Sequence, residues 1–517
     1  MPDVEDLIAL HAPWATIDRQ WRLTPFEQFM WLDDRPAYPL VFEVVLRFAG
    51  PIDPVVMADA WRFAIARHPL LRATIRAISG SLIWDAPATG WADLALAGAV
   101  EEPPADLPRI DLEREPGLQG SLRETLEGWD LGLIFHHACC DGHGARMFLQ
   151  DLVLAYTVLG GASAEEDPFF RSDAALLDER GKIPGVEGGR GAVWQRLKHA
   201  ARFALLRPTP VASTISPGLA GCGQSAASLD AMPVDGGKPR LVHRATEWKK
   251  CMENFFHGRL AQPARHTSGS SLGHRSHTFS AEEVAGMDAI QQRFSATRND
   301  IALAMLFSVL AGWQRTNRIS PRARLRVAVP TDMRSRADER MPAANRYTYI
   351  FLERRVGDCG DWESLLPGLQ RDFQERRQQG RGVEFLGSLQ RAARFPQAMR
   401  WVLQRPTCFA TAVLTNLSDP SWRLRKRLPV DAEGLMWLGK AQCLDIQIRT
   451  PPLRPGTRWG FGIFEYAGRM TISFRYDSTS ITSAAADAIM ECYVNHWQTL
   501  LATSEGCRQS AIASAAK

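Results

Sequence analysis

Hydrophobic and polar positions near the N-terminus first follow the period of a strand and then that of a helix. The run "YPLVFEVVLRF" at 38–48 is rich in β-branched and aromatic residues. Asp53 then precedes Pro54 in the pattern of a helix N-terminus, and Pro69 ends that helix near His68. The pattern predicts a strand, a turn and a helix.

The same order of elements is repeated further along the chain. "DLGLIFHH" at 130–137 is a short apolar strand, and "ARMFLQDLVLAYTVLGG" at 145–161 has helical periodicity with glycine at its C-terminal end. The stretch between them, "FHHACCDGHG" at 135–144, therefore lies at a corner between a strand and a helix.

Strand patterns return in the second half, at 324–330, 347–356 and 408–418. The stretches "WGFGIFEY" and "RMTISFRY" flank Ala467 and Gly468, and apolar and polar residues alternate in the second of them. This alternation predicts a half-buried hairpin. The apolar helix at 301–313 is shorter than the roughly 20 residues that span a bilayer, so it is predicted to be a core helix.

Chain length and two connector-like segments predict two domains. A chain of 517 residues is too long for one ordinary core. The segments 209–240 and 264–278 are rich in Gly, Ser, Pro and Thr, as connectors are. The expected division is an N-terminal lobe at 1–185, a basic helix and flexible linker at 186–275, and a C-terminal lobe at 276–517.

Composition and charge narrow the possible partners and the compartment. Lys and Arg exceed Asp and Glu by only four, so no nucleic-acid partner is expected. The first residues, "MPDVEDLIALHAPW", are acidic where a secretory signal would be basic. Nine cysteines, an odd number, form no Cys-x-x-Cys pair, which favours reduced thiols in a cytoplasm.

The corner at 135–144 could in principle be a metal site, a redox pair or a general base. Adjacent residues at a strand end point to opposite faces, so His136 and His137 cannot both bind one ion, and no second pair of zinc ligands is found. Cys139 and Cys140 are interpreted as small buried hydrophobic residues. A general base remains; the alternative is a core histidine beside an ordinary turn, with Asp141 capping the following helix.

The stretch His136-His137-Ala138-Cys139-Cys140-Asp141-Gly142 resembles the HHxxxDG signature of the chloramphenicol-acetyltransferase-like superfamily. That superfamily includes nonribosomal peptide condensation domains, wax ester synthases and the BAHD acyltransferases. Other stretches resemble its motifs in the right order, from residue 23 to about 480; they are "LTPFEQFMWL" (23–32), "RHPLLRATI" (67–75), "TRNDIALA" (297–304), "AVPTDMR" (328–334) with Asn345, and "VLTNLSD" (413–419).

The resemblance implies an α/β fold of two lobes in a V-shaped pseudo-dimer with a tunnel between them. It implies that His137 is the catalytic base, that His136 is structural, and that Gly142 keeps the tunnel clear. Asp141 is implied to pair with an arginine, for which Arg334 is the best candidate. Further residues expected at the substrates are Asn345, Thr415 and Asn416.

The implied activity is acyl transfer from a thioester to a hydroxyl or an amine, without a metal or a redox cofactor. Acyl-CoA or a phosphopantetheine-linked acyl group is the substrate, and an acyl or peptidyl carrier protein is a possible partner. The BAHD motif Asp-Phe-Gly-Trp-Gly is absent, so the donor and the acceptor stay open. The rival hypothesis is a catalytically silent relative that binds an acyl carrier or a lipid.

Two basic segments suggest further binding partners, each with a structural alternative. The segment 190–207, "RGAVWQRLKHAARFALLR", contains no acidic residue and has an apolar stripe. Such a helix could lie on an anionic membrane, dock an acidic carrier protein or pack against the lobes. The run "WRLRKR" at 422–427 could meet CoA phosphates or form a solvated turn.

Overall fold

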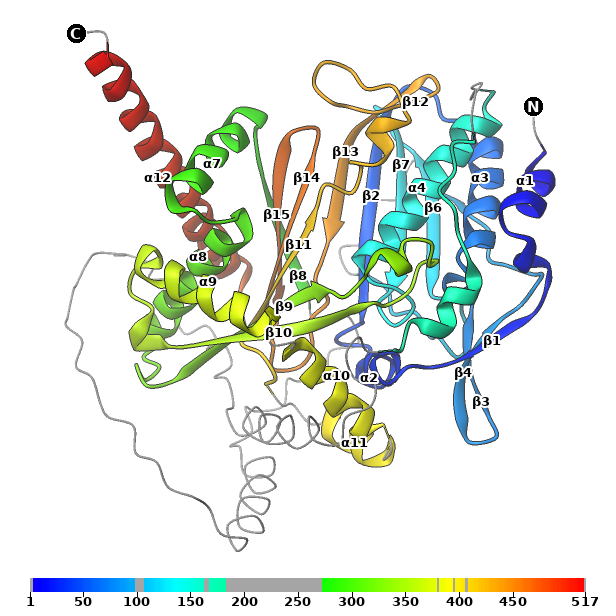
Figure 1. Cartoon of the computed structure of the whole chain (residues 1–517), viewed down its shortest axis with the longest axis horizontal. Coiled ribbons are helices and arrows are strands. Elements are labelled where there is room, and N and C mark those ends of the chain that lie inside the picture. Colours follow the sequence, from blue (N-terminus) through cyan, green and yellow to red (C-terminus); the bar gives the residue numbers. More distant parts are fainter. Residues whose placement is uncertain are drawn as a thin grey trace, which may run out of the picture.

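Two α/β lobes face each other in the computed structural model, and each contains a six-stranded sheet with helices on its outer side (Figure 1). This confirms the predicted fold class. The structure describes residues 3–97, 107–161, 167–182, 272–378, 381–393, 396–404 and 408–515. The predicted basic helix at 190–207 and the linker up to residue 271 lie outside these residues.

The sheet of the first lobe has the strand order β12-β13-β2-β7-β6-β5. Its strands are β2 (Val41–Ala49), β5 (Ala95–Ala97), β6 (Leu118–Glu124), β7 (Gly128–His136), β12 (Trp437–Leu438) and β13 (Ala441–Arg449). One side is covered by α1 (Val4–His11), α3 (Pro54–Arg67) and α4 (Gly142–Leu159) (Figure 1). The large core between them includes Trp61, Phe135 and Phe148.

The sheet of the second lobe has the order β10-β9-β11-β14-β15-β8. Its strands are β8 (Leu272–Phe279), β9 (Arg324–Asp332), β10 (Tyr347–Arg355), β11 (Ala412–Ser418), β14 (Trp459–Tyr466) and β15 (Arg469–Asp477). Its outer helices are α7 (Ala281–Phe294), α8 (Arg298–Thr316), α9 (Trp362–Gln378) and α12 (Ser483–Ala515) (Figure 1). They enclose a second core, as predicted for the helix at 301–313.

Smaller elements complete the molecule. A three-stranded sheet has the order β1 (Arg19–Arg22), β4 (Ser81–Ala86) and β3 (Thr74–Ile78). Helix α2 (Pro25–Asp33) of the first lobe contacts α10 (Arg381–Ala392) and α11 (Pro396–Leu403). The short 3₁₀ helices are Pro13–Thr16, Pro69–Leu71, Ala174–Glu179, Arg336–Asp338, Val356–Asp358 and Leu424–Lys426.

Local signals set the ends of the helices near the site. The Asp53 carboxylate accepts from the amides of Val55 and Val56, and Pro54 occupies the first position of α3. Helix α4 begins three residues earlier than predicted because Asp141 caps it and its first turn starts at Gly142. The helix therefore begins directly after the two histidines and the two cysteines.

Strand β13 crosses between the predicted lobes. It lies within 276–517, yet it pairs antiparallel with β2 of the first lobe, with Ile446 opposite Leu46. Pairing between strands distant in sequence leaves no local signal, so composition alone did not reveal this crossover. The connector predicted at 264–278 is also too long, because β8 begins at Leu272 and pairs with β15.

The hairpin of β14 and β15 turns at Ala467 and Gly468 as predicted, and both residues have positive φ. It is not half-buried, however. The polar face of β15 is also buried, because it faces the first lobe: the Arg475 guanidinium donates to the Val41 carbonyl over 3.0 Å. Tyr38 donates in the same region to the Asp477 carboxylate over 3.1 Å. These contacts tie the two lobes together.

Candidate functional site

The two adjacent histidines lie at the end of β7, and their backbones bond in opposite directions. The His136 amide donates to the Gly117 carbonyl, and the His137 amide donates to the Leu40 carbonyl, each over 2.7 Å. The His136 side chain is fully buried in the first lobe, where its Nδ1 accepts from the Ala138 amide over 3.1 Å. The strand end therefore separates the two rings, as its alternation requires.

His137 lies where β10 of the second lobe meets the first lobe. Its Nε2 is 3.5 Å from the Tyr347 hydroxyl, and its ring packs edge-on against Phe42. Burial lowers the pKa of His137 below its ordinary value, although the nearby Asp141 carboxylate acts in the opposite direction. The imidazole is therefore neutral at pH 7 and can accept a proton.

Asn345 holds the backbone that carries His137. Its amide nitrogen donates to the carbonyls of His137 over 2.9 Å and Ala138 over 2.7 Å. The segment before it is anchored in the first lobe, since the Ala343 amide donates to Nδ1 of His68 over 2.9 Å. His68 in turn lies 3.1 Å from the buried Asp151 carboxylate. The contacts of Asn345 thus orient the histidine loop.

Asp141 forms both an ion pair with Arg334 and the N-terminal cap of α4, the two roles considered for it from the sequence. Its carboxylate receives two hydrogen bonds from the Arg334 guanidinium, over 2.9 and 3.1 Å, and it caps α4 by accepting from the Gly144 amide over 2.9 Å. The Arg346 amide also donates to it. Burial alone would raise the pKa of Asp141, but these partners, Arg334 above all, lower it.

Thr415 and Asn416 lie on β11 of the second lobe. Thr415 is buried opposite Gly462, and Asn416 is exposed and accepts from the Ser418 amide over 2.8 Å. Within the described residues, no hydrogen bond joins either of them to His137. Their part in substrate binding stays a prediction.

Gly142 faces the same strand across the gap between the lobes. A Cβ atom on Gly142 would lie 2.5 Å from Cδ2 of Leu417. The close contact is with the tip of a flexible side chain, so glycine here sets the distance between α4 and β11.

We expect Gly142→Ala to lower kcat/KM for a thioester by about tenfold, because Leu417 must move into the space beside the histidine loop. Global stability should not fall, since alanine favours helices over glycine by about 1 kcal/mol. The double variant Gly142→Ala/Leu417→Ala should restore most of the rate. Equal impairment of the single and double variants would contradict this steric account.

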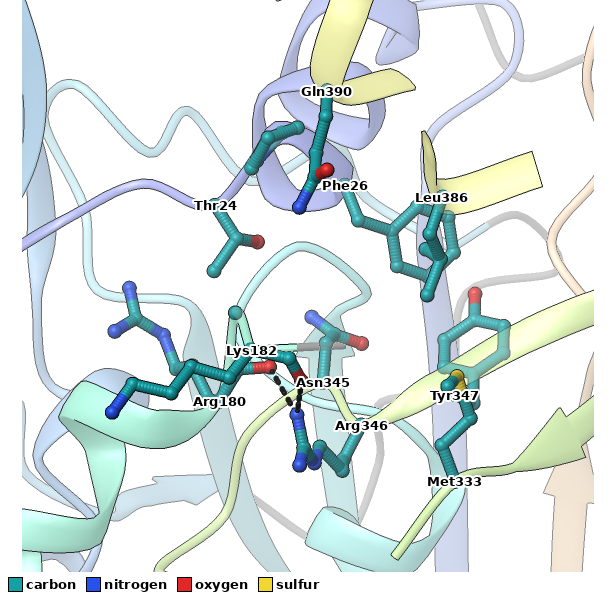
Figure 2. A pocket seen from close by; sticks show the side chains of 12 residues that line it. Thr24, Phe26, Arg180, Lys182, Met333, Asn345, Arg346, Tyr347, Leu386 and Gln390 are labelled. Carbon is teal, nitrogen blue, oxygen red and sulfur yellow. Dashed lines mark hydrogen bonds between the residues drawn. The ribbon is translucent and has the colours of Figure 1, made fainter. Parts of the chain in front are cut away.

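A small pocket, partly open to solvent, lies beside the histidine loop. Figure 2 shows the apolar side chains of Phe26, Leu386 and Tyr347 on one side and the polar side chains of Thr24 and Lys182 on the other. It is also lined by Pro25, Arg180, Gly181, Met333, Asn345, Arg346 and Gln390. The pocket therefore has an apolar wall next to Tyr347.

Tyr347 and Phe26 were not expected at the site from the sequence. Tyr347, Tyr349 and Phe351 alternate along β10, and their rings form a cluster with Phe26 and Phe385. The alternation in "YTYIF" was a visible signal for one aromatic face of a strand. It could not show that this face meets a histidine 210 residues away in sequence.

Cys139 and Cys140 are fully buried free thiols, and burial raises the pKa of both. This confirms their interpretation as small hydrophobic residues. Among the described residues, no group of three His, Cys, Asp or Glu side chains could hold a metal ion. No helix in the described ranges is long and apolar enough to cross a membrane.

Comparisons with known proteins agree with this architecture. No family model matches the chain. Uncharacterised proteins from two strains of Mycobacterium tuberculosis are 25% identical over 354 residues, which cover 66% of this chain and 68% of theirs. These relatives establish homology but carry no assigned activity.

Solved structures match over nearly the whole chain, and two of them serve as examples. The starter condensation domain of rhizomide synthetase, solved with C8-CoA and Leu-SNAC, has a TM-score of 0.56 at 15% identity, and the match covers 96% of both chains. The epimerization domain of tyrocidine synthetase B has a TM-score of 0.57 at 13% identity, covering 95% of this chain and 98% of that domain. The chain therefore has the condensation-domain fold, which is found in domains with different names and roles.

Proposed function

We propose that the protein is an acyltransferase that moves an acyl group from a thioester to a hydroxyl or an amine, with His137 as the general base. One observation carries this proposal: Nε2 of a half-buried, neutral His137 lies 3.5 Å from the Tyr347 hydroxyl, which is next to a pocket with an apolar side. A neutral imidazole at such a place can accept the proton that an attacking nucleophile must lose.

The reaction proceeds by addition and elimination at the thioester carbonyl. The acceptor oxygen or nitrogen attacks the carbonyl carbon while its proton passes to Nε2 of His137. The tetrahedral intermediate then collapses, the carbon–sulfur bond breaks, and the imidazolium returns the proton to the departing thiolate. The products are an ester or an amide and a free thiol, and the base is regenerated.

Other residues of the motif position the base in this proposal. Asn345 holds the two carbonyls around His137, and the Asp141–Arg334 pair fixes the start of α4. His136 packs inside the first lobe and does not face the substrates. These contacts support a preorganised site, which is the main source of rate in reactions of this kind.

The acyl donor is proposed to be acyl-CoA or an acyl group on a carrier protein. The structurally similar starter condensation domain was solved with C8-CoA and Leu-SNAC, which are thioesters. The apolar side chains of Phe26, Leu386 and Tyr347 offer a surface for the acyl chain or for an apolar acceptor.

Release of free thiol from acyl-CoA, with and without added alcohols or amines, tests the proposal. Acceptor-dependent release together with an ester or amide product supports it, and a carrier-linked acyl group is the second donor to supply. If neither donor gives a product with any acceptor while the acyl thioester still binds, a silent acyl-binding module is the correct account.

The pH dependence of kcat/KM should report the pKa of His137. Burial lowers that pKa below its ordinary value of about 6.5, so the base form predominates at pH 7 and is lost as the pH falls through the lowered pKa. We expect kcat/KM to level off towards pH 8 and to fall about tenfold per pH unit well below the lowered pKa. A profile from pH 4.5 to 8 measures this, and a half-maximum above pH 7 would contradict it.

A further inference from the structure

Arg146, on the second turn of α4, is a partly buried cation without a carboxylate partner among the described residues. Its Nη2 lies 2.8 Å from Nδ1 of His143, and its Nε is buried without a hydrogen-bond partner in the described part of the chain. Burial of an unpaired guanidinium is costly, so a protein rarely keeps one without use.

His143 does not compensate this charge. Burial and then the neighbouring guanidinium groups lower its pKa to about 3, so the ring is neutral and accepts from Arg146. The Asp332 carboxylate lies 3.6 Å from His143, but half of its side chain is exposed and it is already hydrogen-bonded to Arg334 over 3.2 Å. The Asp332 carboxylate, whose charge acts on Arg146, is therefore shared with another arginine.

A second partly buried cation, Arg423, belongs to the basic run at 422–427. Arg423 packs over the rings of Phe170 and Trp422, and within the described ranges it forms no ion pair with a carboxylate. It lies close enough to lower the pKa of Arg146, after burial itself. Arg423 of the basic run 422–427 thus lies near Arg146 of α4.

The local charges do not balance. Arg146, Arg334 and Arg423 supply three positive charges, whereas Asp141 and Asp332 supply two negative charges, and Asp141 is occupied by Arg334. Like charges held together in a partly buried place repel one another unless an anion lies between them. Arginine is the residue that best matches the geometry of phosphate oxygens.

We propose that Arg146 and Arg423 bind a phosphate group, and that this phosphate belongs to the phosphopantetheine arm of the thioester donor. The site is separate from the pocket in Figure 2, whose lining includes neither arginine. It lies about 6 Å along α4 from Gly142, where the helix starts beside the histidine loop. The assignment of the phosphate to a donor rests on the proposed acyltransferase function.

Calorimetric titration of the full chain with 4′-phosphopantetheine and with pantetheine tests the site directly. The phosphorylated form should bind at least about tenfold more tightly, as hydrogen bonds to charged groups allow. Arg146→Gln and Arg423→Gln should each remove most of this difference. Arg425→Gln is the matched control, because Arg425 belongs to the same basic run but pairs with Asp419.

Thermal unfolding without phosphate separates binding from a structural role. Removing one of two repelling cations should leave the melting temperature of Arg146→Gln equal to or above that of the wild type, while phosphopantetheine stabilises it less. A lower melting temperature with unchanged affinity for phosphopantetheine would overturn the proposal. Equal affinity of the wild type for pantetheine and phosphopantetheine would also overturn it.

The same titration distinguishes this site from the proposed activity. The His137→Ala protein should keep the preference for phosphopantetheine even if no acyl transfer is ever found, because the site does not include the base. Competition by adenosine 3′,5′-bisphosphate would support CoA as the source of the phosphate. Phosphate-dependent binding without that competition would support a carrier protein as the source.

Discussion

Replacing His137 with alanine is expected to reduce kcat by about 10²–10⁴-fold, because a positioned base contributes an effect of this size. The ring lies at the lobe junction and packs edge-on against Phe42, so the two cores remain intact in the variant. Single-turnover thiol release measures the loss, and circular dichroism verifies the fold. Near wild-type turnover in His137→Ala would show that another group removes the proton.

His136→Ala is the matched control for this experiment. It removes an equal volume one residue earlier, but from a fully buried place where the ring accepts from the Ala138 amide. We expect it mainly to lower the free energy of unfolding, by about 2–4 kcal/mol. The pair of variants therefore separates loss of the base from loss of packing next to it.

Asp141→Asn is expected to lower the free energy of unfolding by about 3–5 kcal/mol and to impair turnover as well. Asparagine caps helices as well as aspartate does, but it cannot neutralise Arg334, whose charge would be left buried without its partner. Chemical denaturation at pH 7 measures the change. Unchanged stability and activity would assign Asp141 to capping alone.

Asp53→Asn is the matched control, because Asp53 caps α3 in an exposed place and pairs with no arginine in the described part of the chain; a change within about 0.5 kcal/mol is expected. The pH dependence gives a second check. Since Arg334 holds the pKa of folded Asp141 below its ordinary value, the stabilisation is fully present above about pH 3.9. It is lost as the pH falls through the lowered pKa, so the wild type and Asp141→Asn should converge in acid.

Features that depend on neighbouring residues could be predicted from the sequence. The cap at Asp53, the helix after Asp141 and the turn at Ala467 each depend on a few adjacent side chains and on backbone preferences. The two-lobed fold and the contact between Asp141 and Arg334 were expected from the family resemblance, which adds information that periodicity does not contain.

Features that depend on distant contacts could not be predicted. The alternation in β15 predicted that its polar face is exposed to solvent. Arg475 and Asp477 are buried instead, because the other lobe covers them. Asn345 lines the pocket, but its hydrogen bonds to two backbone carbonyls at the end of β7 left no signal in the sequence. Tertiary packing decides which face of a strand contacts a given loop. A single sequence contains little information about such contacts.

The crossover of β13 determines how this protein can be divided. A fragment ending at residue 182 would keep β2 and its neighbour β7 but lose β13, which pairs with β2 from Glu43 to Ala49. An apolar edge strand left open in this way is a template for aggregation. A split version of the protein therefore has to supply residues 437–449 together with the N-terminal fragment, and a cut in the sequence between the lobes does not yield two self-sufficient halves.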